Sequence, residues 1–208
     1  MINKILKENR IISGMMNYNE IKGVLEQLYI ILEQGIEGDI VELGCNRGTT
    51  SLFIRRLLNE FKSDKKMYVY DSWEGLPDKH EYDKNKVNIL TAKGHCKSSK
   101  DIFITNFKRA KLELPIINSG WFKNIPDNKY PDKICFAFYD GDFYTSIIDS
   151  FNKTFHKMTK NSRIVLDDCG NNIMPGVEKA CNDFLKDKEE VLINHGSYKN
   201  GGLIIKIL

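Results

Sequence analysis

Acidic side chains recur where apolar segments of the chain give way to polar ones. Five acids stand at or just before these boundaries, and they are Glu42, Asp71, Asp140, Asp167 and Asp168. Carboxylates at such positions can hold a hard cation, accept hydrogen bonds from hydroxyl groups or take a proton from a reacting group. Whether these acids act together depends on the elements that position them.

The apolar segments alternate with segments of helical periodicity. Helices are expected over 18–34, 49–61, 98–111, from just after 140 to about 158, and over 175–187, where Pro175 suits a first helical turn. Strands are expected over 39–43, 67–71, 115–120, 134–140, 162–168, 190–194 and 203–208. The loop between the last two strands contains Asn200-Gly201, a pair that favours a hairpin.

This alternation predicts an α/β fold in which helices cover both faces of a mostly parallel sheet, with an antiparallel hairpin at the C-terminal end. Parallel sheets bind ligands beyond the carboxyl ends of their strands, near the point where the strand order reverses. The acids described above are therefore expected at the edge of the sheet where a ligand binds.

The stretch GDIVELGCNRG at 38–48 joins the first of these strands to a helix. A dinucleotide-binding fingerprint, G-x-G-x-x-G, needs three glycines at fixed positions, and no register that uses Gly44 or Gly48 supplies all three. Glu42 would also repel a phosphate group. The stretch therefore favours a ligand that carries an ammonium group, which Glu42 can bind, and no phosphate.

Asp71 stands at the end of the next strand, where an acid can accept hydrogen bonds from both hydroxyls of a ribose. An amino group and a ribose without a phosphate describe S-adenosylmethionine. The alternative is that Gly44 is an ordinary turn glycine and Glu42 is exposed to solvent. The hairpin supports the first interpretation. NAD-binding Rossmann sheets are typically all parallel, whereas a parallel sheet closed by a hairpin is typical of Rossmann-like class I methyltransferases.

Six motifs then occur in a fixed order along the chain, and they are ELGCNRG, YDSWEGLP, SGWFKNIP, FYDGDFYTS, LDDCG and PGVEKACNDF. Together they resemble the macrocin O-methyltransferase family over residues 10–187. The resemblance implies an enzyme that methylates sugar hydroxyls on natural products with S-adenosylmethionine and a divalent metal. The sequence departs from the family pattern at Cys169, where an aromatic residue is more frequent, and at Trp73, where a Phe is common.

The resemblance implies that Asp140, Asp167 and Asp168 bind Mg²⁺ or Mn²⁺ and that Asp142 is the catalytic base. The residues themselves also favour a metal. The interval between Asp140 and Asp167 fits a strand–helix–strand unit, which brings both to one edge of the sheet, where crowded carboxylates repel one another unless a hard cation is present. The alternative is that these acids are solvated or cap helices, as Asp142 could for a helix that begins near Phe143.

The cofactor is expected to lie along the ends of the first three strands. Ser72 follows Asp71 and is expected to contact the ribose or the adenine, and Ser119 and Gly120 fall where the family has its adenine pocket. Trp73 is equally compatible with a wall of this pocket and with the core. The predicted cofactor-binding residues are Glu42, Gly44, Gly48, Asp71, Ser72, Ser119 and Gly120.

The composition predicts a single domain over residues 1–208, in which 1–37 form an N-terminal helical or lid segment. The net charge is only +3 and the basic residues are scattered, which argues against a nucleic-acid partner. The sequence shows no signal peptide or membrane span, and its five cysteines form no C-x-x-C pair, so we expect a cytoplasmic protein. Association into a homo-oligomer is left open.

Three functions are compatible with these residues. The first is Mg²⁺-dependent O-methylation of a sugar hydroxyl on a glycan, a nucleotide sugar or a glycosylated natural product. The second is O-methylation of another small molecule, such as a catechol-like phenol, which can chelate a metal similarly. The third is a non-catalytic cofactor-binding protein that retains the fold. The intact acids Asp140, Asp142, Asp167 and Asp168 argue against the third, and only the family resemblance separates the first two.

Overall fold

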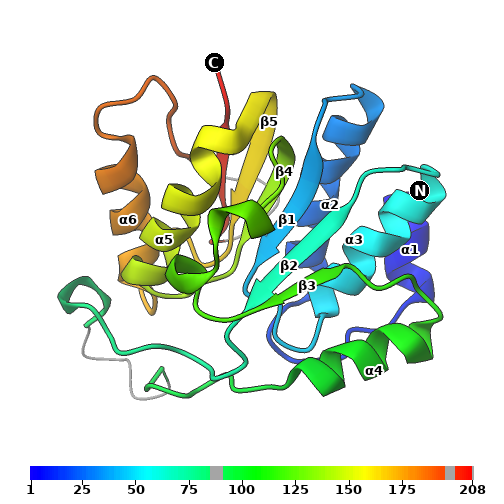
Figure 1. Ribbon diagram of the computed structural model, residues 1–208, viewed down its shortest axis with the longest axis horizontal. Coiled ribbons are helices and arrows are strands. Elements are labelled where there is room, and N and C mark those ends of the chain that lie inside the picture. Colours follow the sequence, from blue (N-terminus) through cyan, green and yellow to red (C-terminus); the bar gives the residue numbers. More distant parts are fainter. Residues whose placement is uncertain (85–90, 195–199, 208) are drawn as a thin grey trace.

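The computed structural model describes residues 1–84, 91–194 and 200–207, and Figure 1 shows its elements. Its α-helices are α1 (Ile2–Glu8), α2 (Tyr18–Glu33), α3 (Thr49–Glu60), α4 (Lys100–Ala110), α5 (Tyr144–Thr154) and α6 (Pro175–Leu185). Its strands are β1 (Asp39–Leu43), β2 (Met67–Asp71), β3 (Ile116–Ser119), β4 (Ile134–Tyr139), β5 (Met158–Leu166), β6 (Ile193–Asn194) and β7 (Gly202–Ile205). Short 3₁₀ turns are η1 (Glu81–Asp83), η2 (Phe122–Asn124), η3 (Asp127–Lys129) and η4 (Phe155–Lys157).

The described strands form one sheet in the order β3-β2-β1-β4-β5-β7-β6. The pairs β1–β2, β1–β4, β2–β3 and β4–β5 are parallel, whereas β7 runs antiparallel to both β5 and β6. The strand order reverses between β1 and β4, which is the point where parallel sheets bind ligands. The predicted α/β fold, with a mostly parallel sheet and an antiparallel hairpin at its end, is confirmed.

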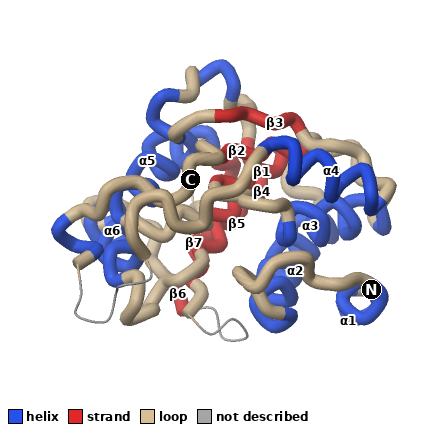
Figure 2. Tube along the Cα trace, turned by 90° about the horizontal axis from the view of Figure 1, so that it is seen from below, coloured by secondary structure: helices blue, strands red, loops and turns tan. Residues whose placement is uncertain are grey.

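Helices cover both faces of the sheet, with α5 and α6 on one side and α1 to α4 on the other (Figure 2). Successive side chains of a strand point to opposite faces. Ile40 of β1 therefore packs in the core beneath α2 and α3, while Val41 and Leu43 pack in the core beneath α5 and α6. Every residue of β4 is buried, as expected for a central strand that is covered on both faces.

The boundary between α5 and β5 differs from the sequence prediction. The helix ends at Thr154 instead of near 158, and η4 leads directly into β5 at Met158. Met158 already pairs with Ile134 of β4, which explains why the strand begins earlier than expected. The strand also ends before Asp167 and Asp168, so these two acids stand on the loop that follows it.

The last hairpin is shorter than predicted. β6 contains only two of the residues expected over 190–194, because the Glu190 carboxylate is turned inward and bonds with the Lys206 ammonium group and the N–H of Ile207. Residues 195–199 of the loop between these strands lie outside the described residues, whereas Asn200 of the predicted Asn-Gly pair is described and has a φ of 65°. β6 and β7 nevertheless pair as the two strands of an antiparallel hairpin.

The N-terminal segment consists of α1, a linking stretch and α2. Ile5 of α1 is buried in the core. In the linking stretch, the hydroxyls of Ser13 and Thr49 lie 2.8 Å apart in a hydrogen bond, which ties the stretch to the first residue of α3. Among the described residues, no helix has both the length and the apolar character that crossing a membrane requires.

Candidate active site

A cavity of about 600 Å³ lies at the carboxyl ends of the parallel strands. These strand ends point to the lower side of the molecule in Figure 1. Its wall includes residues that follow β1, β2, β3, β4 and β5, so it spans the point where the strand order reverses. Of the residues predicted from the sequence, those in the wall are Gly44, Asp71, Ser72, Gly120, Asp140, Asp142, Asp167 and Asp168. Glu42, Gly48 and Ser119 are not part of the wall.

A glycine is required at position 44 and at position 48 for different structural reasons. Gly44 has a φ of +90°, and a Cβ there would lie 1.9 Å from the carbonyl oxygen of Asp140. Its lack of a side chain therefore lets the loop after β1 lie directly against the end of β4. Gly48 is the N-cap of α3, and a Cβ there would lie 2.8 Å from the ring of Phe103. Gly48 thus serves the packing of α4 against α3, not the wall of the cavity.

Asp71 organises the turn that follows β1. Its carboxylate accepts hydrogen bonds from the backbone N–H groups of Cys45 (3.0 Å), Asn46 (2.8 Å) and Trp73 (2.7 Å). A carboxylate offers roughly four acceptor sites, so three backbone bonds leave little capacity for two ribose hydroxyls at once. The role of Asp71 in shaping this turn was not predicted from the sequence.

Glu42 lies one layer below the cavity. Its side chain is 1% exposed, and the Ser51 hydroxyl of α3 donates a hydrogen bond to its carboxyl group. Burial, the largest cause, raises the pKa of Glu42 to about 8. The alternative that Glu42 is exposed to solvent is therefore wrong. Direct contact between Glu42 and an ammonium group stays a prediction, and the position of Glu42 below the wall does not favour it.

The four acids predicted for catalysis line the same cavity, near enough for their charges to influence one another. Burial, followed by the charges of Asp167, Asp142 and Asp168, raises the pKa of Asp140 well above its usual value. Burial and the neighbouring Asp168 likewise raise the pKa of Asp142. Asp167 is held at the end of β5 by its own N–H, which donates to the carbonyl oxygen of Tyr139 (2.9 Å). The predicted convergence of the ends of β4 and β5 is thus what the structure shows.

Asp142 does not cap α5. The N-cap of the helix is Phe143, which makes no side-chain capping bond, and Asp142 has a φ of 60° in the left-handed region. The capping alternative for Asp142 is therefore wrong. Several non-glycine residues of the cavity wall have a positive φ, and they are Asn46, Cys96, Asp142 and Asp168. Such strained backbone persists where the surrounding structure enforces it, which is typical of functional sites.

Within the described residues, no three acids, imidazoles or thiols converge closely enough to form a metal-binding cluster. The chemistry of the four acids nevertheless fits a hard cation. All their donors are carboxylate oxygens, and burial, followed by the charges of the neighbouring acids, raises the pKa of both Asp140 and Asp142. Asn171 also donates a hydrogen bond of 2.6 Å to the carboxylate of Asp168 and orients it.

Of the remaining predicted cofactor-binding residues, Ser72 lines the cavity, whereas Ser119 lies outside its wall. The hydroxyl of Ser72 accepts a hydrogen bond from the N–H of Glu74 (3.1 Å) at the wall. The hydroxyl of Ser119 instead accepts from the indole N–H of Trp73 (3.1 Å), and this indole packs edge-on against Phe103 in the core. Trp73 therefore belongs mainly to the core, although its bond to Ser119 steadies the end of β3.

A family model described as Macrocin-O-methyltransferase (TylF) matches residues 10–194. The chain belongs to this family. It is 27% identical over 145 residues to the 8-demethyl-8-(2,3-dimethoxy-alpha-L-rhamnosyl)-tetracenomycin-C 4'-O-methyltransferase of Streptomyces olivaceus, which covers 66% of this chain and 55% of that protein. It is 24% identical over 160 residues to the demethyldecarbamoylnovobiocin O-methyltransferase of Streptomyces niveus, covering 74% of this chain and 61% of that protein. The chain thus spans little more than half the length of these relatives.

Solved structures agree with this TylF-family assignment at the level of the fold. The O-methyltransferase NovP superposes with a TM-score of 0.81 at 22% sequence identity, over 93% of this chain and 82% of that chain. The calicheamicin methyltransferase CalS11 superposes with a TM-score of 0.74 at 14% identity, over 98% of this chain and 89% of that chain. At these identities the superpositions establish a class I methyltransferase fold.

The sequence of this TylF-family chain did not predict one wall of the cavity. Residues from the segment between β2 and α4, including Leu76, Thr91, Lys93 and His95, line the cavity. The segment is fixed at its far end by Asn46, whose side-chain amide donates to the carbonyl oxygen of Cys96. The sequence of this segment has no helical or strand periodicity. Only its length and the EGLP motif could have indicated that it forms part of the site.

Proposed function

We propose that this chain transfers the methyl group of S-adenosylmethionine to a hydroxyl of a sugar. The observation that carries the proposal is a single cavity in which the end formed by Gly44, Asp71 and Gly120 is continuous with the end that holds the four acids. The first end suits a nucleoside-containing donor at the switch point of the sheet. The second end suits an alcohol that must lose its proton during the reaction.

The donor would lie along the ends of β1, β2 and β3. The turn after β1 is held by Asp71 and approaches β4 closely because residue 44 is a glycine. Ser72 and Gly120 extend this surface to β3, and Glu42 supports it from below through Ser51. The methyl group would then face the end of β4, where the acids stand.

Asp142 would take the proton from the acceptor hydroxyl. Burial and the neighbouring carboxylates raise its pKa, and a carboxylate with a raised pKa is a stronger base toward an alcohol. The strained backbone at Asp142 aims this acid from the loop before α5 instead of into the helix. Donor and acceptor held in line in one cavity would supply the rest of the rate enhancement.

Asp140, Asp167 and Asp168 would hold Mg²⁺ or Mn²⁺. The ion, when bound, supplies Lewis-acid chemistry that lowers the pKa of a coordinated hydroxyl. What supports this part of the proposal is the all-oxygen donor set and the repulsion among the acids. Asn171 would keep Asp168 oriented toward the cavity.

The names of the relatives support a sugar-bearing acceptor. One relative is named for a rhamnosyl-tetracenomycin substrate, and another, from Micromonospora griseorubida, is a mycinamicin III 3''-O-methyltransferase. We therefore place the acceptor among glycans, nucleotide sugars and glycosylated natural products. The free thiols of all five cysteines suit the reducing cytoplasm as the place of reaction.

The test is transfer of a labelled methyl group. The protein is incubated with S-adenosylmethionine labelled in its methyl group, Mg²⁺ and a panel of rhamnosyl and other deoxyhexosyl glycosides, with catechol as a phenolic acceptor. We expect label on a sugar oxygen, and loss of transfer in excess chelator that Mg²⁺ or Mn²⁺ restores. Label on catechol alone would assign the second acceptor class. Full transfer in excess chelator would remove the metal from the mechanism.

A further inference from the structure

Asp83 lies in η1, within the segment that links β2 to α4, and its side chain is only 1% exposed. One carboxylate oxygen accepts a hydrogen bond of 2.8 Å from the N–H of His80 in the same turn. The other oxygen accepts a hydrogen bond of 2.8 Å from the N–H of Tyr144, the first residue of α5. A single buried carboxylate therefore ties the β2–α4 segment to the start of a helix on the other side of the cavity.

The same carboxylate also lies at the start of α6. Gly176 is the second residue of this helix, and a Cβ at that position would lie 1.8 Å from Asp83 Oδ1 and 2.9 Å from the nitrogen of Tyr144. Neither α5 nor α6 has a side-chain cap from its own N-cap residue. An anion at a helix N-terminus is stabilised by the unpaired N–H groups and the helix dipole. Asp83 supplies that anion where both helices begin.

The two helix starts follow the two acid-bearing loops. Tyr144 comes two residues after Asp142, and Pro175, which opens α6, follows the loop that begins with Asp167 and Asp168. Figure 1 shows the described residues that follow β2, up to η1, passing beneath the lower ends of α5 and α6, where both helices begin. Asp83 thus contacts the starts of both helices, each of which follows an acid-bearing loop of the cavity wall.

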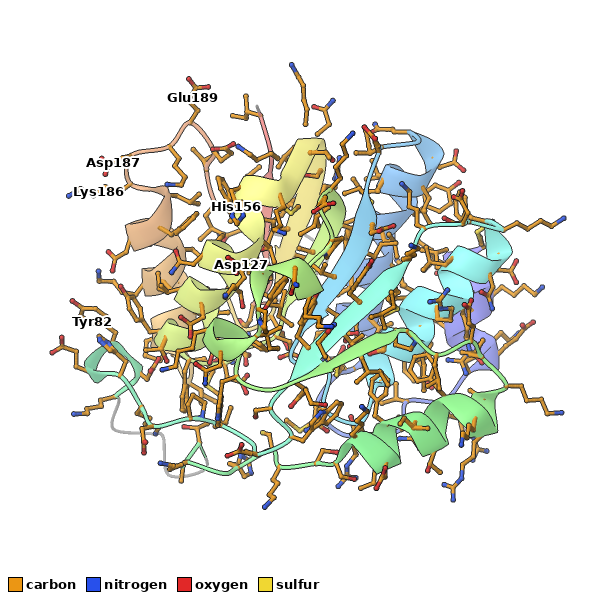
Figure 3. The ribbon with its side chains drawn as sticks, in the orientation of Figure 1. Tyr82, Asp127, His156, Lys186, Asp187 and Glu189 are labelled. Carbon is orange, nitrogen blue, oxygen red and sulfur yellow. The ribbon has the colours of Figure 1, made fainter. Side chains whose placement is uncertain are left out.

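A cluster of side chains on the outer surface closes over the same junction. The His80 ring stacks on the Tyr144 ring, and the Tyr82 ring packs edge-on against it. Tyr82 stands at the outer edge of the molecule beside α6 (Figure 3). The Lys179 ammonium lies 4.6 Å from the centre of the Tyr82 ring, and the Tyr144 hydroxyl donates to the carboxylate of Asp183 (3.0 Å). These contacts join η1 to α5 and α6.

We propose that Asp83 is a positioning residue for the reaction, which sets the spacing between the two acid-bearing loops and holds the β2–α4 wall against them. The inference rests on the proposed function, because positioning matters only if the acceptor reacts at these acids. The donor end of the cavity has its own support in Asp71, so loss of Asp83 should affect the acceptor side selectively.

The first test compares Asp83→Ala with Glu81→Ala, a matched control in the same turn whose side chain is exposed. Amide exchange at Tyr144 should become faster in Asp83→Ala and stay unchanged in Glu81→Ala. With a rhamnosyl glycoside as the acceptor, kcat/KM should fall roughly 10- to 100-fold in Asp83→Ala. Affinity for S-adenosylhomocysteine should stay at the wild-type value. Asp83→Asn, which keeps one of the two acceptor oxygens but not the charge, should recover part of the lost kcat/KM.

Gly176→Ala disrupts the same contacts in a second way, because the added methyl group displaces the Asp83 carboxylate without removing it. This variant should reproduce the kinetic defect, and the double variant with Asp83→Ala should be little worse than either single one. Wild-type exchange at Tyr144 in Asp83→Ala, or equal losses of donor and acceptor affinity, would overturn the proposal. If the wild-type protein transfers no methyl group to any acceptor, the proposed function fails, while the exchange rates still decide whether Asp83 holds the junction.

Discussion

Glu42, Asp71 and Asp83 are carboxyl groups that the protein holds in place by two kinds of hydrogen bond. Asp71 and Asp83 accept backbone N–H groups from distant turns, and Glu42 receives the hydroxyl of Ser51. A buried carboxyl group needs such partners, because an unpaired one costs several kcal/mol. Each of the three therefore supports one part of the structure around the cavity, whereas the chemistry is proposed for the acids after β4 and β5.

Asp142→Asn tests the catalytic base. The amide preserves size but cannot accept the proton, so turnover should fall roughly 10²- to 10⁴-fold while affinity for S-adenosylhomocysteine is unchanged. Asp127→Asn is the control, because Asp127 pairs with Lys153 at the surface, away from the four acids, and is labelled in Figure 3. Both variants are measured by initial rates and by thermal unfolding. Near wild-type turnover of Asp142→Asn at unchanged melting temperature would assign the proton to another group.

Glu42→Gln tests whether burial raises the pKa of Glu42, through the pH dependence of the free energy of unfolding. Burial raises the pKa of Glu42 to about 8 from its ordinary value of 4.5. Between these values the unfolded chain releases a proton that the folded chain keeps, so rising pH favours unfolding of the wild type. The stability of Glu42→Gln relative to wild type should therefore increase from pH 5 to pH 8 and stay constant below pH 4, as measured by denaturant unfolding.

The exposed acid Glu60 provides the control for this pH series. Glu60→Gln should show no comparable gain over wild type between pH 5 and pH 8. A difference between Glu42→Gln and wild type that does not depend on pH would show that Glu42 is already ionised in the folded protein.

At the scale of elements, the sequence predicts what depends on local pattern. The apolar runs at 39–43, 67–71 and 134–140 locate the central strands closely, because a parallel sheet buries both faces of its strands. The predicted end of α5 near 158 was wrong, because residues 155–157 form η4 and the pairing of β5 with β4 already begins at Met158. The sequence also located Asp140, Asp142, Asp167 and Asp168 near the cavity, because these acids directly follow the apolar runs that form β4 and β5.

The supporting residues could not be predicted in this way. Asp83, Thr91 and His95 lie in a segment without periodicity, and their positions depend on contacts with α5, α6 and the end of β1. The burial of Glu42 depends in the same way on Ser51 of a different element. Such contacts form only when the whole sheet and its helices have assembled.

A series of glycine substitutions tests how the loop after β1 is placed. Gly44→Ala combines a positive φ with a close contact to β4, whereas Gly35→Ala meets only a positive φ, and Gly14→Ala meets neither. Gly14→Ala should be nearly neutral, Gly35→Ala should lose about 1 kcal/mol of unfolding free energy, and Gly44→Ala should lose more. Gly44→Ala alone should also lose affinity for S-adenosylhomocysteine. Equal stability of Gly44→Ala and Gly35→Ala would contradict a tight contact between the loop and β4.

At the scale of the whole molecule, the cavity lies where two separate cores meet the edge of one sheet. One core packs α2 and α3 against one face of the sheet, and the other packs α5 and α6 against the opposite face, so each central strand contributes to both cores. The proposed donor end of the cavity lies beyond β1, β2 and β3, and the acid-bearing end lies beyond β4 and β5. Described residues of the β2–α4 segment line the same cavity, so one continuous site forms only when both faces of the sheet are covered.

Calorimetric titration with S-adenosylhomocysteine tests most directly whether this cavity is a methyl-donor site beside an acid-bearing acceptor site. The wild-type protein should bind it in the micromolar range, or about −8 kcal/mol, and should bind NAD far more weakly. Asp142→Asn should keep this affinity, because Asp142 stands at the acceptor end, whereas Gly44→Ala should weaken it. Binding of NAD with no heat from S-adenosylhomocysteine or S-adenosylmethionine would contradict the account.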